Sequence, residues 1–251
     1  MMIEGLQADI LLPAFAAGLL VLASHVPLGA EVLRRGIIFI DLAVAQIAGL
    51  GIVVAHVLGA HDHGWQVQAA AVSAALGGAL FLRWMEKKAP ERQEALIGVT
   101  FVVAASAAIL LLAKDSHGGE HLRDMLVGQI LWTTWGDLLP LAVITAGVLA
   151  AWHGLKIKSS PLGFYLLFAV AITATVQVVG VYLVFASLII PALVMRGRVW
   201  LGITVGAAGY ALGLIGSALI DLPSGAAIVV ALAGVTALAA AVKPTSKENH
   251  A

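Results

Sequence analysis

Residues 162–195, LGFYLLFAVAITATVQVVGVYLVFASLIIPALVM, decide the fold, because this long stretch contains no charged side chain. About 20 consecutive apolar residues suffice to carry a helix across the hydrocarbon core of a bilayer. The stretch is too long for one ordinary crossing, and it contains Gly180 and Pro191, at which a helix readily breaks. It therefore predicts either one tilted helix with a re-entrant piece or two tight crossings.

The rest of the chain has a similar composition. Of its 251 residues, 61% are hydrophobic and only 11% are charged, and the mean hydropathy is +1.01. A soluble domain carries roughly 25% charged residues. Equal numbers of acidic and basic residues argue against a nucleic-acid-binding protein, and the absence of cysteine excludes a disulfide-stapled secreted domain. The composition predicts an all-α, polytopic membrane helical bundle of about eight to nine transmembrane helices.

Apolar stretches separated by short charged islands predict the individual spans. The predicted spans are 9–27, 36–59, 65–83, 94–113, 137–153, 162–195, 199–220 and 224–242. The first is preceded by Glu4 rather than by basic residues, so we interpret it as a retained helix and not as a cleaved secretory signal. Residues 243–251 are polar and are expected to form a short cytoplasmic tail.

Basic residues predict the orientation, because cytoplasmic loops carry an excess of Lys and Arg. Eight of them follow the first, third and fifth spans: Arg34, Arg35, Arg83, Lys87, Lys88, Arg92, Lys156 and Lys158. If these are cytoplasmic, the N-terminus lies outside. Two crossings within 162–195 would also place four later residues inside, namely Arg196, Arg198, Lys243 and Lys247. The charges therefore favour nine crossings over eight.

Asp41 and Gln46 are the unusual polar residues of the second span. At about 1.5 Å per residue, Asp41 would lie one and a half turns inside Gly36, and Gln46 near the helix midpoint. A carboxylate in the centre of an apolar helix costs roughly 2.5 to 3.5 kcal/mol on insertion scales, so it should face a cavity, a partner or an ion. Two interpretations stay open: Asp41 lines an ion pathway, or it pairs with a basic residue such as Arg34 or Arg35.

Histidines supply the other candidate metal ligands. His56 lies about four turns beyond Asp41, so the two could line one pathway but cannot bind a single ion together. Imidazole and carboxylate groups suit zinc and other borderline divalent ions. The candidate metal-binding residues are Asp41, Gln46, His56, His61, His63, His117 and His121. In the alternative interpretation, His56 is merely hydrogen-bonded near an interface and the loop histidines, four of the seven, are merely solvated.

Motifs for covalent chemistry are missing from the sequence. There is no GxxxxGK[ST] phosphate loop and no GxSxG elbow, so the chain itself cannot hydrolyse ATP by the P-loop route. Residues 117–121 match the H-x-x-E-H pattern of a zinc peptidase, but Gly118 and Gly119 argue against a helix there.

Four polar residues of the 162–195 stretch either line a cavity or form packing hydrogen bonds: Thr173, Thr175, Gln177 and Ser187.

Three segments together resemble the membrane subunits of the zinc/manganese/iron permease family of ABC importers. They are residues 28–46 (LGAEVLRRGIIFIDLAVAQ), 178–192 (VVGVYLVFASLIIPA) and 221–229 (DLPSGAAIV), with a weaker likeness at 94–98 (EALIG). The resemblance implies that residues 1–242 form a single multi-pass permease domain in the bacterial plasma (inner) membrane. It implies a non-enzymatic subunit with divalent metal as cargo and no permanently bound cofactor.

The resemblance also implies partners: a separate cytoplasmic ATP-binding subunit, an external metal-binding protein, a second permease copy and membrane lipids, but no nucleic acid. Asp41 falls on the acidic position of the family motif Gly-Asp-x-x-x-His, where this chain has Ile40 before it and Ala45 in place of the histidine. The family usually has a longer cytoplasmic segment at this point, with an Asp-x-x-x-Ala-x-x-x-Gly signature. This chain has only the short segment 152–161 (WHGLKIKSSP) before the next span.

These departures motivate an alternative function, a non-transporting membrane scaffold or metal sensor derived from such a permease. A proton-driven carrier is a third hypothesis, less favoured because Asp41 is almost the only ionisable residue well inside a predicted span. The choice among zinc, manganese and iron stays open at this point, because zinc accepts histidine readily and manganese favours oxygen ligands.

Overall fold

The computed structural model describes residues 8–60, 64–113, 126, 128–155, 157, 160–195 and 197–241. Its α-helices are α1 (Ala8–Arg35), α2 (Ile40–Val57), α3 (Trp65–Lys88), α4 (Gln93–Leu112), α6 (Trp135–Gly154), α7 (Pro161–Val179), α8 (Val181–Ile189), α9 (Val199–Ile220) and α10 (Ser224–Ala241). Short 3-10 turns are η1 (Pro90–Arg92), η2 (Ile130–Trp132) and η4 (Pro191–Val194). The described residues contain no strand, which confirms the all-α prediction.

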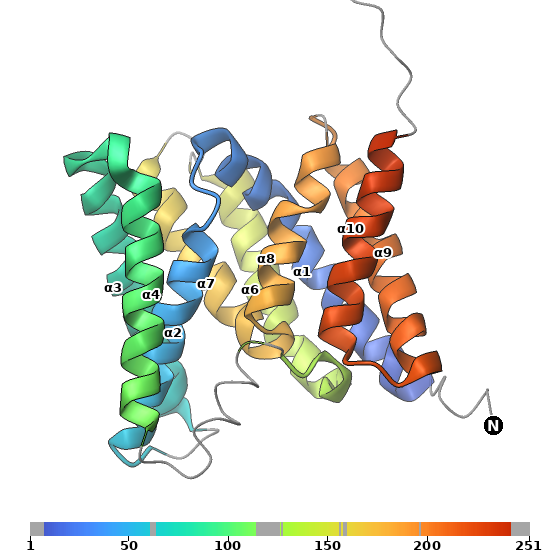
Figure 1. Ribbon diagram of the computed structural model, residues 1–251, viewed down its shortest axis with the longest axis horizontal. Coiled ribbons are helices and arrows are strands. Elements are labelled where there is room, and N and C mark those ends of the chain that lie inside the picture. The colour runs from blue at the N-terminus through green and yellow to red at the C-terminus, as the bar shows by residue number, and fades with distance from the viewer. Residues whose placement is uncertain are drawn as a thin grey trace, which may run out of the picture.

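Eight of the described helices are long and apolar enough to cross a membrane, and the segment Val181–Val194 is a shorter apolar helix. The chain reverses at Gly180, whose φ of 80° lies in the left-handed region that glycine tolerates. Figure 1 shows α8 returning toward the end of the bundle at which α7 begins. In the same view α1 begins at one end of the bundle and α10 finishes at the other, which requires an odd number of passes. Two passes within 162–195 account for this.

The first two helices have different bounds from the predicted spans. The predicted first span stops at residue 27, but α1 continues to Arg35. Its last turns tolerate charge because Glu31 pairs with both Arg34 and Arg35. Residues 36–39 are not helical, Gly36 has a φ of 69°, and α2 begins only at Ile40. We call the end of the bundle at which α1 stops and α4 starts the basic end, because it carries Arg34 and Arg35.

Three helices are the most deeply buried of the bundle. In α1, α2 and α7, 56% of the most apolar window is buried, whereas in α4 and α10 the share is 22%. Figure 1 shows α2, α3 and α4 on one side, α8, α9 and α10 on the other, and α6 and α7 between them. The poorly buried helices have large apolar side chains at the surface, as a lipid-facing position requires.

Glycines of α9 allow close helix contacts within the chain. A Cβ atom at Gly206 would lie 2.6 Å from Leu22 of α1, and one at Gly213 would lie 2.4 Å from Ile228 of α10. These positions therefore serve packing inside one chain, because a small residue lets the neighbouring helix approach.

Candidate functional site

Asp41 is the second residue of α2 and is 1% exposed. The sequence placed it one and a half turns inside the helix, which is wrong because residues 36–39 are not helical. Neither carboxylate oxygen makes a hydrogen bond, although the backbone N–H groups of Asp41 and Leu42 contribute favourable electrostatics at the helix N-terminus. An ionisable group in this state is costly in a membrane protein and marks a functional position.

The alternative in which Asp41 pairs with an arginine finds no support among the described residues. Glu31 accepts hydrogen bonds from both arginines of the α1 C-terminus, with the Arg35 Nε to Glu31 oxygen distance at 2.6 Å. The Arg35 guanidinium also lies 4.3 Å from the ring centroid of Phe164. Arg34 and Arg35 are therefore engaged at the end of α1, and the ion-pathway role of Asp41 stays a prediction.

Glu94 is an acidic residue that contacts the turn before α2. It lies in the first turn of α4, and its Oε1 accepts a hydrogen bond of 3.3 Å from the backbone N–H of Phe39. Its other carboxylate oxygen, Oε2, is buried and has no hydrogen-bond partner. Glu94 was not among the candidate ligands predicted from the sequence, although it is an acidic residue at the start of a predicted span.

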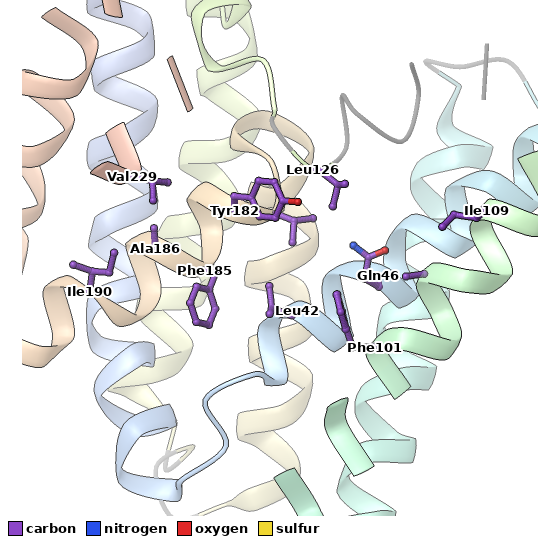
Figure 2. Close-up of a pocket in the computed structure, with 12 residues that line it drawn as sticks. Leu42, Gln46, Phe101, Ile109, Leu126, Tyr182, Phe185, Ala186, Ile190 and Val229 are labelled. Carbon is purple, nitrogen blue, oxygen red and sulfur yellow. The ribbon is translucent and has the colours of Figure 1, made fainter. Parts of the chain in front are cut away.

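Gln46 lies beside a cavity of about 510 Å³. The cavity is lined by Leu42, Gln46, Phe101, Ala105, Ile109, Leu126, Val181, Tyr182, Phe185, Ala186, Ile190 and Val229. Figure 2 shows Gln46 and the α4 residues Phe101 and Ile109 on one side, and Tyr182 and Phe185 of α8 on the other. Gln46 is itself only 4% exposed, so its carboxamide adds a polar group to an otherwise mostly apolar cavity wall.

The candidate histidines do not join this site in the described part of the chain. His56 lies in the last turn of α2, at the opposite end of that helix from Asp41. His61, His63, His117 and His121 lie outside the described residues. Within the described residues no group of three or more His, Cys, Asp or Glu side chains is arranged to hold a metal ion. A complete protein cage for a metal is therefore not seen there.

His25 is a buried ionisable residue that the sequence analysis overlooked when it considered Asp41 almost alone inside the spans. It is 0% exposed in α1, and it joins that helix to α7. Its Nδ1 lies 3.0 Å from the Ser24 hydroxyl and its Nε2 lies 3.2 Å from the Thr175 hydroxyl. The sequence shows a histidine within an apolar stretch, which could have identified His25. It does not show that the partner is Thr175 on α7.

Other polar residues of the 162–195 stretch also form helix-to-helix hydrogen bonds. The carboxamides of Gln177 and Gln68 bond to each other reciprocally, at 2.8 and 3.1 Å. The Ser187 hydroxyl lies 2.7 Å from the Tyr210 hydroxyl. The packing interpretation therefore applies to Thr175 and Ser187. Gln177 fits both interpretations, because it also lines a cavity of about 420 Å³, and the Thr173 hydroxyl is buried without a partner.

Comparison with known protein families matches residues 7–152 and 147–243 to the ABC 3 transport family. The chain belongs to the ABC 3 transport family. The two matched segments overlap at residues 147–152, within α6. Membership confirms the resemblance seen in the sequence. With the apolar helices, it identifies a multi-pass membrane protein of a metal-transport ABC permease family, consistent with the bacterial inner membrane.

Relatives of this ABC 3 family chain match along most of their length. The manganese transport system membrane protein MntC of Halalkalibacterium halodurans is 26% identical over 238 residues, covering 84% of this chain and 80% of the relative. A probable iron transport system membrane protein of Haemophilus influenzae is 24% identical over 258 residues, covering 91% and 92%. PsaBC from Streptococcus pneumoniae, solved in complex with Fab, shares the fold with a TM-score of 0.73 at 22% identity, covering 97% of this chain and 95% of that one.

Proposed function

We propose that this chain is the membrane-spanning permease subunit of an ABC importer for divalent metal ions. The observation that carries the proposal is Asp41, a fully buried carboxylate with two unpaired oxygens in a metal-transport permease family. Relatives named for manganese and iron support a metal cargo. Oxygen donors at Asp41 and Gln46 favour manganese or ferrous iron, because zinc prefers nitrogen and sulfur ligands. Zinc is the third candidate cargo, and the uptake experiment below compares it with manganese and iron.

The proposal includes partners that supply energy and metal. A separate cytoplasmic ATP-binding subunit would hydrolyse ATP, because this chain has no phosphate-binding loop of the P-loop type. An external metal-binding protein would deliver the ion, and a second permease copy would complete the membrane part. The permease would itself perform no covalent chemistry.

Uptake of metal into vesicles tests this function. The chain would be reconstituted with the ATP-binding subunit that co-purifies with it, and uptake of radioactive manganese would be measured with competing ferrous iron or zinc. We expect uptake only with ATP and with the ATP-binding subunit, and stronger competition from iron than from zinc. Uptake that persists without ATP, and stops when the proton gradient is collapsed, would instead support a proton-driven carrier.

A scaffold or metal sensor is the second candidate. Two observations favour it: α6 ends at Gly154 with α7 starting at Pro161, which leaves a short connection, and Ala45 stands at the histidine position of the family motif. Failure to co-purify with any ATP-binding subunit, combined with no metal flux, would favour this second function. Co-purification with an ATPase and ATP-driven flux would exclude it.

A further inference from the structure

We propose that Asp41 and Glu94 form a two-carboxylate cation site at the basic end of α2, in which Glu94 of α4 supplies the second negative charge for a divalent metal ion. The inference rests on the proposed transport function and adds to it one ligand and one position along the pathway. It is carried by hydrogen bonding, burial and the positions of the neighbouring charges.

Contacts between α4 and the start of α2 bring the two carboxylates to the same place. The hydrogen bond from the Phe39 N–H fixes the Glu94 side chain at the first turn of α2, at 3.3 Å. Asp41 follows Phe39 by two positions, as the second residue of α2. Two acidic side chains from different helices therefore share one helix N-terminus.

The carboxylate oxygens around this point are buried but mostly unbonded. Both oxygens of Asp41 and the Oε2 atom of Glu94 have no hydrogen-bond partner of good geometry, although the backbone N–H groups of Asp41 and Leu42 face Asp41 and that of Ile38 faces Glu94. Buried polar groups are normally hydrogen-bonded, and each exception requires an explanation such as an ion. Carboxylate oxygens are the donors that a hard divalent cation binds, and Asp41 and Glu94 offer three such oxygens at the start of α2.

Three arginines near this end of the bundle are paired with other carboxylates, whereas no ion pair of the described residues includes Lys87, Lys88 or Arg92. Arg34 and Arg35 are bonded to Glu31, and the Arg83 Nη1 lies 2.5 Å from a Glu86 oxygen. Among the ion pairs of the described residues, none involves Asp41 or Glu94. Two like charges in a low-dielectric interior are unfavourable without a counter-ion, and one divalent cation neutralises two carboxylates.

Apolar cavities lie on both sides of Leu42, the residue after Asp41. Leu42 lines the cavity that contains Gln46, and it also lines a groove of about 620 Å³ between α2 and α4 together with Phe39. Figure 2 shows Leu42 at the end of the Gln46 cavity from which α2 begins. The carboxylate pair thus lies between the cavity and the basic end, which the positive-inside rule predicts to be cytoplasmic. An incoming ion would reach Gln46 first and the carboxylate pair last.

A purely structural role for Glu94 is the competing explanation, because a side-chain oxygen that accepts from a backbone N–H stabilises a helix N-terminus. Glu94→Gln separates the two roles. Glutamine keeps an acceptor oxygen for Phe39 but carries no negative charge. Glu94→Ala removes both, and Glu94→Asp keeps the charge.

Binding of manganese chloride to the full-length purified chain tests the inference by equilibrium dialysis. We expect one Mn²⁺ per chain, because both carboxylates belong to the same chain. Asp41→Asn and Glu94→Gln should each weaken binding by at least about tenfold, as changes at and around metal ligands do. Glu94→Asp should stay closer to wild type than Glu94→Gln. Glu91→Gln, in the exposed turn η1, is the matched control and should bind as wild type does.

Three results would overturn the inference. Wild-type Mn²⁺ affinity in Glu94→Gln shows that Glu94 only caps α2, and Glu94→Asp binding no better than Glu94→Gln shows that its charge is not used. Absence of Mn²⁺ binding to the wild-type chain also removes the site. If Glu94→Gln binds normally while Asp41→Asn does not, the proposed transport function still stands. That function fails separately if vesicles show no ATP-driven uptake.

Discussion

Two buried ionisable residues, His25 and Asp41, differ in their hydrogen bonding. Both ring nitrogens of His25 lie within hydrogen-bond distance of a hydroxyl, one on its own helix and one on α7. Neither oxygen of Asp41 has such a partner. Both side chains are at most 1% exposed, so water does not explain the difference.

The contrast separates polar groups that hold helices together from polar groups that have no partner in the protein and can bind an ion. A satisfied buried group contributes to packing between helices, whereas an unsatisfied one costs stability and persists where function requires it. Gln68 and Gln177 are exposed, but they too join two helices, because each carboxamide bonds the other. We therefore expect changes at His25 to affect stability and changes at Asp41 to affect transport.

The largest effect is expected for Asp41→Asn. Metal uptake in vesicles should fall by about 100-fold, because the change removes a charged ligand that neighbouring groups do not replace. The thermal unfolding midpoint should stay the same or rise, since an uncompensated buried charge is lost. Unchanged uptake would remove Asp41 from the pathway, and a large fall in the unfolding midpoint would place it with His25.

His25→Ala should have the largest effect on stability. Removing a fully buried ring leaves a cavity and deprives the Ser24 and Thr175 hydroxyls of a partner, at a cost of about 2 to 4 kcal/mol. Thermal unfolding in detergent measures this, and Mn²⁺ binding should stay within a few fold of wild type. His25→Gln is the control, since a carboxamide keeps a donor and an acceptor. Loss of metal binding without loss of stability would contradict the structural role.

Gln46→Leu should have an intermediate effect on transport. The change keeps side-chain size but removes the carboxamide from the cavity between α2 and α8, so uptake should fall by about tenfold or less, as for a group outside the charged ligands. Because leucine suits an apolar wall, the unfolding midpoint should not fall. Gln46→Glu offers a matched comparison: it adds charge in the cavity, and improved Mn²⁺ capture there would extend the pathway toward α8.

The smallest effect is expected for the carboxamide pair. Replacing Gln68 and Gln177 by Leu, singly and together, gives a double-mutant cycle whose coupling free energy should be about 0.6 kcal/mol, as for other hydrogen bonds between membrane helices. Thermal unfolding of the purified variants in detergent micelles would measure this coupling free energy. A coupling of zero would mean that a partnered polar pair does not stabilise α3 against α7.

Local hydropathy was enough to predict most of the helices. The apolar runs predicted the membrane bundle, and Gly180 and Pro191 predicted where the long stretch breaks. The end of α1 was less predictable. Glu31 pairs with Arg34 and Arg35 within the helix, so the helix continues through charged residues at which a loop was expected. Asp41 also stood out in the sequence, since a carboxylate near an apolar run is unusual without any knowledge of its neighbours.

The sequence by itself therefore determined that the chain spans a membrane many times and that Asp41 is exceptional, because both follow from the cost of placing each residue type in lipid. Only the tertiary structure decided what surrounds that residue. Glu94 reaches the start of α2 across 55 positions of sequence, and Thr175 reaches His25 across 150. Hydropathy is a property of neighbours along the chain, whereas the pairing of a buried charge depends on which helices pack together.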